Sequence, residues 1–310
     1  MKLKHVFALI LTVLIGVSAL FTFAFSDRFM LSNPEETFLV YASSYPVYAL
    51  GSMILKDIPG MELRMLLQPQ DAGLSSYALS DWDIALIDGC DVLMLNGGGY
   101  EGFEASVNSG DKIVISTLSG LKYSMDNVKV LTADSEETDA KDNPWLFLCA
   151  DGAVQMSEAI TANMLAVDEA YTLEYYRNLG SAREYLDKID KEIRETALDG
   201  TIKVAAGHKA LYYTAKETGL FCDLVIDRLP AQDMTDEALS AILALFQENG
   251  IGVILLESQA PNEISAYFEE NGIQVIKLDI MTSLTEKDGI EAYGETLIKN
   301  ARLIREKLGS

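Results

Sequence analysis

Short, almost continuous apolar runs alternate with helical patterns in both halves of this chain. In the first half the runs are TFLVYA (37–42), MELRMLL (61–67), DVLMLNGGG (91–99) and DKIVIST (111–117). In the second half they are TIKVAAG (201–207), GIGVILLE (250–257) and GIQVIKLD (272–279). Apolar strands separated by helices are typical of a parallel sheet that is covered on both faces. We therefore predict an α/β fold with two lobes, each a mainly parallel sheet flanked by helices.

One long helical segment separates the two halves. Between Asp168 and Leu198 apolar residues recur at helical spacing, and charged residues fill the positions between them. A helix of about 30 residues would be roughly 45 Å long. We therefore predict that one long helix joins the lobes: residues 37–165 form the N-terminal lobe, 166–199 the linking helix and 200–310 the C-terminal lobe.

The net charge of −23 limits the partners that this chain can bind. Because so acidic a surface repels phosphate backbones, we expect no nucleic-acid partner. The acidic stretch Thr132–Asp142 is predicted to be a solvated loop, and a cation-gathering role for it stays open.

The N-terminal residues 1–36 are predicted to be a signal sequence or membrane anchor with a short linker. Lys2 and Lys4 precede an apolar stretch from Val6 to Phe25, which is the arrangement of an export signal. The stretch is also close to the roughly 20 residues of a membrane helix. We favour an uncleaved anchor over cleavage after Ser26, with the rest of the chain outside the cytoplasm.

The three cysteines, Cys90, Cys149 and Cys222, show no spacing typical of a metal site. We predict that they are buried, small apolar side chains. One internal disulfide is the alternative, and the sequence does not choose its pair.

Polar side chains follow the predicted strands in both lobes, where open α/β sheets bind ligands. In the first lobe they are Ser43, Ser44, Gln68, Gln70, Asp71 and Asn96. In the second lobe they are His208, Glu257 and Asp279. An imidazole and two carboxylates suit zinc, manganese or iron. Each carboxylate could instead cap the following helix, whereas His208 has no obvious capping role, so we predict a cation site between the lobes.

The order of the segments resembles the solute-binding proteins of zinc and manganese ABC importers, a bilobal family whose lobes are joined by a rigid helix. The likeness extends from about Phe38 to Leu308. It is carried by YASSYPVYALGSMI (41–54), DIALIDGCDVLMLNGGGYEGF (83–103), NPWLFLCADGAVQMSEAI (143–160), GHKALYYTAKETGL (207–220) and VIKLDIM (275–281).

The resemblance also implies which residues hold the metal. The third histidine of the family falls on His208 and its final acid on Asp279. Leu74 or Ser75 stands closest to the first histidine, and Trp145 takes the place of the second. The resemblance therefore implies an altered and weakened site, in which Asp71, Glu257 or a serine hydroxyl are possible substitutes.

Two kinds of function follow from the resemblance. The first is an extracytoplasmic solute-binding component of a zinc- or manganese-type ABC transporter, a monomer with the metal as its transported ligand and an ABC permease as its partner. The alternative is a repurposed protein that binds an organic ligand or metal complex, or a paralogue that binds no metal. Aromatic residues would line its cleft: Tyr45, Tyr77, Trp145 and Phe147.

We predict no catalytic activity. The sequence has no nucleophile elbow, phosphate-binding loop or HExxH motif. The glycine-rich NGGGYEG segment (96–102) lacks the GxGxxG spacing and is predicted to be a turn.

Overall fold

The computed structural model describes residues 37–67, 69, 74–107, 112–132, 134–227 and 234–309. The predicted N-terminal anchor lies outside the described residues, as do Gln68, Gln70 and Asp71. Residues Leu39–Ile58 and Leu63–Ser310 form one compact unit that contains the site discussed below, and the rest of the described residues group separately. Within the described residues, no helix combines the length and the apolar character needed to span a bilayer.

The first sheet has four strands in the order β2-β1-β3-β4. The strands are β1 (Phe38–Ala42), β2 (Met61–Met65), β3 (Val92–Leu95) and β4 (Ile113–Ser116). Strand β3 pairs in parallel with both β1 and β4, and all four of its residues are buried. The strands coincide with the four apolar runs of the first half, which confirms the predicted parallel sheet.

Two helices accompany this sheet. Helix α2 (Tyr45–Ile54) follows β1 directly, with Pro46 in its first turn, where the missing N–H of proline costs no hydrogen bond. Helix α3 (Asp81–Asp88) begins with a capping box, in which the Ser80 hydroxyl accepts from the Asp83 N–H and the Asp83 carboxylate accepts from the Ser80 N–H. A short 3₁₀ turn, η1 (Glu104–Ser106), lies between β3 and β4.

The second sheet has six strands in the order β10-β9-β7-β8-β5-β6. The strands are β5 (Lys129–Leu131), β6 (Glu137–Thr138), β7 (Lys203–Ala206), β8 (Phe221–Ile226), β9 (Val253–Glu257) and β10 (Gln274–Leu278). All pairs are parallel except that of β5 with β6. Both lobes therefore have the predicted, mainly parallel sheets.

Strands β5 and β6 come from the first half of the chain but belong to the second sheet. Val130 of β5 pairs with Val225 of β8, although the sequence places residues 37–165 in the N-terminal lobe. Part of the acidic stretch predicted as a solvated loop is in fact an edge strand, in which Thr138 pairs with Val130. Strand β5 has three residues and β6 only two, which is too short to show strand periodicity, so only the pairing reveals these strands.

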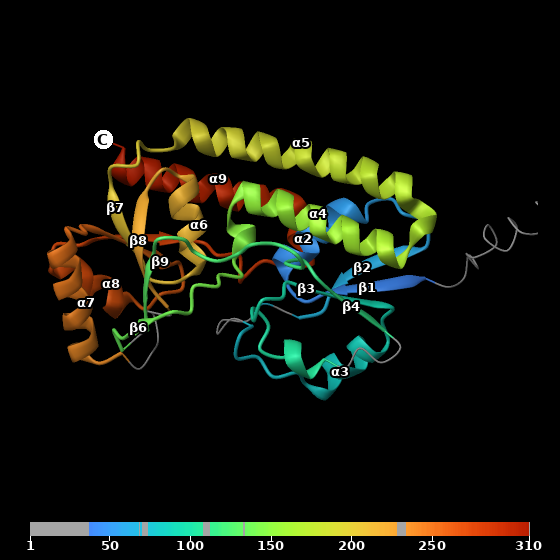
Figure 1. The fold of residues 1–310 in the computed structure, drawn as a ribbon, viewed down its shortest axis with the longest axis horizontal. Helices are drawn as coiled ribbons and strands as arrows, with labels where there is room; N and C mark the ends of the chain where they lie inside the picture. Colours follow the sequence, from blue (N-terminus) through green and yellow to red (C-terminus); the bar gives the residue numbers. More distant parts are fainter. Residues whose placement is uncertain are drawn as a thin grey trace, which may run out of the picture. The chain divides into compact units, whose positions relative to one another are not determined.

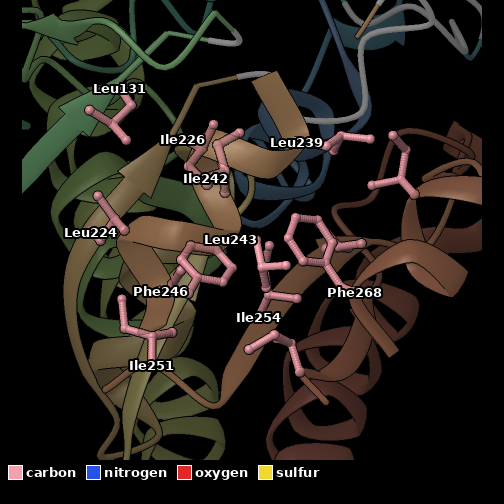
Figure 2. Packing of buried hydrophobic residues seen from close by; sticks show 14 of the residues in the cluster. Leu131, Leu224, Ile226, Leu239, Ile242, Leu243, Phe246, Ile251, Ile254 and Phe268 are labelled. Carbon is pink, nitrogen blue, oxygen red and sulfur yellow. The ribbon is translucent and has the colours of Figure 1, made fainter. Parts of the chain in front are cut away.

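The core of the second lobe explains why β5 joins this sheet. Leu131 of β5 is buried in the same apolar cluster as Phe246 and Phe268 (Figure 2). These two rings are stacked with their centroids 5.5 Å apart and come from helices α7 (Asp236–Asn249) and α8 (Asn262–Glu270). Burial of one such side chain contributes about 1.5–3 kcal/mol.

A layer of long helices connects the two sheets. It contains α4 (Ala150–Val167), α5 (Thr172–Thr196) and α9 (Gly289–Leu308). Helix α5 runs alongside α4 and α9 (Figure 1), and leads from the end of α4 to β7. The predicted linking helix is confirmed, although it has 25 residues and is therefore roughly 37 Å long. It is shorter than predicted because a separate 3₁₀ turn, η3 (Glu169–Tyr171), takes up the first residues.

Helix α5 is anchored by side chains near its start and near its middle. Near its start, Asn178 Nδ2 donates to the carbonyl oxygens of Ile54 and Lys56, which terminate α2. Near its middle, the Tyr185 hydroxyl donates to the Ile290 carbonyl at the start of α9. The first contact satisfies carbonyls at and just beyond the C-terminal end of α2, and the two contacts together attach α5 to neighbours in both halves of the chain.

The three cysteines are buried and free, which confirms the prediction of small buried side chains. Burial raises the pKa of Cys90 to about 11 and that of Cys222 to about 12. Because a thiolate is the form that binds metals and attacks substrates, these thiols are inert at neutral pH.

The linking helix α5 contains Gly180, a position where replacement by alanine should increase the stability of the protein. Gly180 is exposed, and a Cβ atom added to it would meet no atom within 4 Å. We predict that Gly180→Ala stabilises the protein by roughly 0.5–1 kcal/mol, because alanine loses less backbone entropy in a helix. Urea unfolding followed by circular dichroism measures the change.

The matched control is Gly219→Ala. Gly219 has a φ of +74°, and its Cβ would lie 2.0 Å from the Leu198 carbonyl oxygen, so this variant should lose several kcal/mol of stability. Equal changes in the free energy of unfolding for the two variants would contradict the difference in surroundings of Gly180 and Gly219.

Candidate functional site

His208 lies directly beyond β7, and its side chain is 12% exposed. Its Nδ1 atom accepts a hydrogen bond of 3.0 Å from the N–H of Ala210, the first residue of helix α6 (Ala210–Glu217). His208 therefore does have the helix-start role that was not evident from the sequence. Because Nδ1 is the acceptor, the neutral ring carries its proton on Nε2. Nε2 can bind a metal only in the other neutral tautomer, in which the proton lies on Nδ1 and Nδ1 no longer accepts from the Ala210 N–H.

Glu257 is the last residue of β9, the strand next to β7, and its side chain is 20% exposed. One of its carboxylate oxygens lies 3.6 Å from His208 Nδ1. This distance exceeds that of a hydrogen bond, and the Nδ1 lone pair already accepts from Ala210. Burial raises the pKa of Glu257 to about 7. The neutral imidazole and the carboxylate therefore face each other as two acceptors, an arrangement that a proton or a metal cation stabilises.

Asp279 follows β10, and its backbone is held by Asn300 of α9. The Asp279 N–H donates to Asn300 Oδ1 at 3.1 Å, and Asn300 Nδ2 donates to the Asp279 carbonyl at 2.7 Å. The Oδ1 atom of Asp279 accepts from the Met281 N–H at 2.7 Å. One carboxylate oxygen is thus engaged in the turn that leads to Met281.

The structure brings His208 and Glu257 together, and it places Asp279 at the end of a neighbouring strand. Among the residues that the structure describes, no three His, Cys, Asp or Glu side chains gather closely enough to hold a metal ion. Asp279 as a co-ligand of His208 stays a prediction. Asp71, the other predicted substitute, lies outside the described residues.

Trp145 lies against His208. The ring centroids are 5.0 Å apart, and the planes meet at 89°. Trp145 also contacts Tyr100, with a centroid distance of 4.9 Å, and Phe147, at 5.6 Å. Edge-to-face contacts of this kind add favourable packing energy. Trp145 therefore packs directly against the candidate ligand His208.

The predicted aromatic lining is only partly assembled. Trp145 and Phe147 form one cluster with Tyr100, a residue that sequence reasoning did not single out. The Tyr45 hydroxyl donates to the Gly289 carbonyl at 2.7 Å. Tyr77 instead donates to Asp83 and contacts Phe103 near α3. Tyr100 lies in the NGGGYEG segment, which the sequence predicts to be a turn. A turn prediction does not show which residues the tyrosine side chain contacts.

A buried carboxylate organises the first-lobe strand ends. Glu101 is 1% exposed, and accepts hydrogen bonds from the Ser43 hydroxyl at 2.5 Å and the N–H groups of Asn96 and Gly97 at 2.8 and 3.0 Å. Burial raises its pKa to about 7. Ser43 and Asn96, predicted as cleft residues, are thus held by a side chain that sequence reasoning missed.

Asn96 also connects β3 to the segment that carries Trp145. Its Nδ2 atom donates to the Pro144 carbonyl at 2.9 Å. The Tyr293 hydroxyl of α9 donates to the Phe147 carbonyl two residues after Trp145. Trp145 is therefore held between contacts from the first sheet and from α9.

Two parallel-sheet α/β lobes joined by a long helix, with polar side chains at the strand ends, define a bilobal solute-binding fold. The family described as zinc-uptake complex component A, periplasmic (ZnuA), matches residues 40–307. The chain belongs to this family. Comparison with curated protein sequences gives no match.

Solved structures of solute-binding proteins share the fold. The FpvC protein of Pseudomonas aeruginosa in complex with Mn²⁺ is 18% identical, with a TM-score of 0.73 over 88% of this chain and 98% of that one. The Zn(II)-bound ZnuA-like domain of Streptococcus pneumoniae AdcA is 18% identical, with a TM-score of 0.68 over 88% of this chain and all of that one (100%). The laminin-binding protein Lbp of Streptococcus pyogenes is 19% identical, with a TM-score of 0.68 over 87% and 98% of the two chains.

The raised pKa of Glu257 predicts how its removal changes stability with pH. The folded protein binds this proton more tightly than the unfolded chain, whose glutamate has the ordinary pKa of 4.5. The stability contributed by the protonated group is therefore complete below pH 4.5 and is lost as the pH rises through about 7. Glu257→Gln, which mimics the protonated acid, should be more stable than the wild type at pH 8 by about 1–3 kcal/mol, with no difference at pH 4.5.

Denaturant unfolding at a series of pH values measures this difference in metal-free protein. The control is Glu263→Gln on α8, because Glu263 is exposed and its replacement should leave the pH profile unchanged. A higher stability of the wild type than of Glu257→Gln at pH 8 would contradict the interpretation that the Glu257 carboxylate is largely buried and has no cation beside it.

Proposed function

We propose that this chain is the extracytoplasmic solute-binding component of a divalent-metal ABC transporter, with an altered and weakened metal site. Membership of a family of zinc-uptake components supports this role. So does the fold shared with structures described in complex with Mn²⁺, Ni²⁺ and Zn(II). The transported ligand is then a zinc- or manganese-type ion, and the partner is an ABC permease in the membrane. The protein acts by binding and has no catalytic role.

The observation that carries the proposal is the partly buried pair of His208 and Glu257 at the ends of adjacent strands. An imidazole nitrogen and a carboxylate oxygen are ligands of Zn²⁺. Burial raises the pKa of Glu257 to about 7 and so leaves a proton on this group near neutral pH, and a bound cation would replace it. Asp279 is the proposed third ligand.

The site is weak because it has few protein ligands. Structural zinc sites use four, and catalytic sites use three with one water. Trp145 occupies the place of a family histidine, so the first lobe supplies no imidazole. The ion would keep part of its water shell, and its binding would contribute little to holding the lobes together.

A metal titration tests this function. We expect Zn²⁺ or Mn²⁺ to raise the melting temperature of the metal-stripped full-length chain. Free ion at about 100 times Kd stabilises the folded state by about 2.7 kcal/mol, which amounts to several degrees. His208→Ala should abolish the shift, and Asp279→Asn should reduce it.

His5→Ala is the control, because His5 is the other of the two histidines of the chain. The shift should also grow from pH 6 to pH 8, because ionised Glu257 binds the cation and its pKa lies near 7. No shift with either ion, or an undiminished shift in His208→Ala, would favour a paralogue that binds no metal at this site, in which Trp145 only fills the space.

A further inference from the structure

The segment between β10 and α9 begins beside the proposed ligand Asp279, and we call its residues 280–289 the strap. Near the start of the strap, the Met281 N–H donates to Asp279 Oδ1 at 2.7 Å, and the Met281 side chain is buried. Met281 has a φ of +66°, a left-handed conformation that is uncommon for a side chain of this size and persists only where the surroundings enforce it. The direction of this N–H therefore depends on how the rest of the strap is held.

The strap meets an edge of the first sheet through Glu286. Strand β2 lies at the end of the strand order, and the Leu66 N–H just after it donates to the Ala42 carbonyl of β1 at 2.7 Å. Successive N–H groups along a strand point to opposite edges, so the Met65 N–H points away from β1. This N–H donates to Glu286 Oε2 at 3.1 Å. The carboxylate therefore satisfies an edge N–H of the first sheet and attaches the strap to the first lobe.

A second attachment to the first lobe follows directly. Glu286 begins the 3₁₀ turn η4 (Glu286–Asp288), in which a capping box joins Thr285 to Asp288. The Tyr45 hydroxyl of α2 then donates to the carbonyl of Gly289, where α9 begins, at 2.7 Å. The strap is thus held on β2 and on α2, with an ordered turn between the two attachments.

A carboxylate that binds a metal needs a fixed orientation. Ligating carboxylates are themselves hydrogen-bonded, and loss of such an outer partner weakens metal binding about 10–100-fold. For Asp279 this partner is the Met281 N–H, and the left-handed conformation of Met281 can relax once the far end of the strap is released. The first lobe therefore acts, through the strap, on a ligand that belongs to the second lobe.

We propose that Glu286 and Tyr45 are positioning residues for Asp279. By attaching the strap to the first lobe, they keep Met281 in the conformation that directs its N–H to the Asp279 carboxylate. The inference rests on the proposed function, in which Asp279 is a ligand of the divalent ion, and neither positioning residue contacts the ion. Detachment of the strap from the first lobe then favours release of the ion.

Amide hydrogen exchange followed by NMR tests the attachment in the metal-stripped full-length chain. We expect the Met65 amide to exchange about tenfold faster in Glu286→Ala than in the wild type, because its acceptor is lost. The Met281 amide should exchange faster in both Glu286→Ala and Tyr45→Phe. In Glu286→Gln the Met65 amide should stay protected, because the glutamine side-chain oxygen still accepts.

Lys287→Ala is the control for the exchange experiment, because Lys287 is an exposed neighbour on the same turn. It should leave the exchange of both amides unchanged, and circular dichroism melting shows whether each variant is folded. Unchanged exchange of the Met65 and Met281 amides in Glu286→Ala would overturn the inference without any metal present.

Calorimetric titration with Zn²⁺ and with Mn²⁺ tests the effect on the ion. We expect Kd to rise about threefold to tenfold in Glu286→Ala and in Tyr45→Phe, because both act one step removed from the ligand. Glu286→Gln should retain most of the affinity, since it keeps the acceptor and loses only the charge. Equal losses of affinity in Glu286→Gln and Glu286→Ala would show that Glu286 acts through its charge and would overturn its positioning role.

The titration also separates this inference from the proposed function. A wild type that binds neither ion contradicts the proposed function, and the positioning role with it. A wild type that binds an ion no more tightly than Glu286→Ala and Tyr45→Phe do leaves the proposed function intact and overturns the inference alone.

Discussion

The parallel pairing of β5 with β8 determines how the candidate site is assembled. Because β5 comes from the first half of the chain and lies in the second sheet, the chain must return from β6 toward α4. Trp145 lies on this return segment and meets His208 there. The same segment is held by hydrogen bonds from Asn96 and Tyr293. The contact between the tryptophan and the histidine therefore depends on a strand pairing some distance away in the sequence.

This arrangement also means that α5 is not the sole connection between the sheets. The segments before β5 and after β6 run between them as well, and they are tied to α6 by side chains. Asn143 Nδ2 donates to the Lys209 carbonyl at 2.8 Å, and the Thr214 hydroxyl donates to the Leu148 carbonyl at 2.9 Å. Hydrogen bonds to buried carbonyls are costly to break. Several such contacts, together with the stiffness of α5, favour a small range of motion around the site.

The two sides of the site differ in chemical character. The second lobe contributes an imidazole and a carboxylate, which are partly buried and lie 3.6 Å apart. The first lobe contributes hydroxyl, thioether and aromatic groups, and its buried Glu101 is engaged by Ser43 and two backbone N–H groups. A metal held only by the second lobe would have few protein ligands. The candidate site therefore differs from a metal site that has histidines in both lobes, because the only histidine among residues 37–310 is His208.

The sequence by itself determined the two parallel sheets, the helix that joins them and the position of His208 and Glu257 at strand ends. Apolar runs and helical periodicity are local properties, so they can be recognised from consecutive residues. Only the tertiary structure decided that β5 and β6 join the second sheet, that Trp145 contacts both Tyr100 and His208, and that Glu101 anchors the first-lobe loops. These features depend on pairing and packing between residues that are distant in the chain, and short strands or single side chains carry no periodic signal of such contacts.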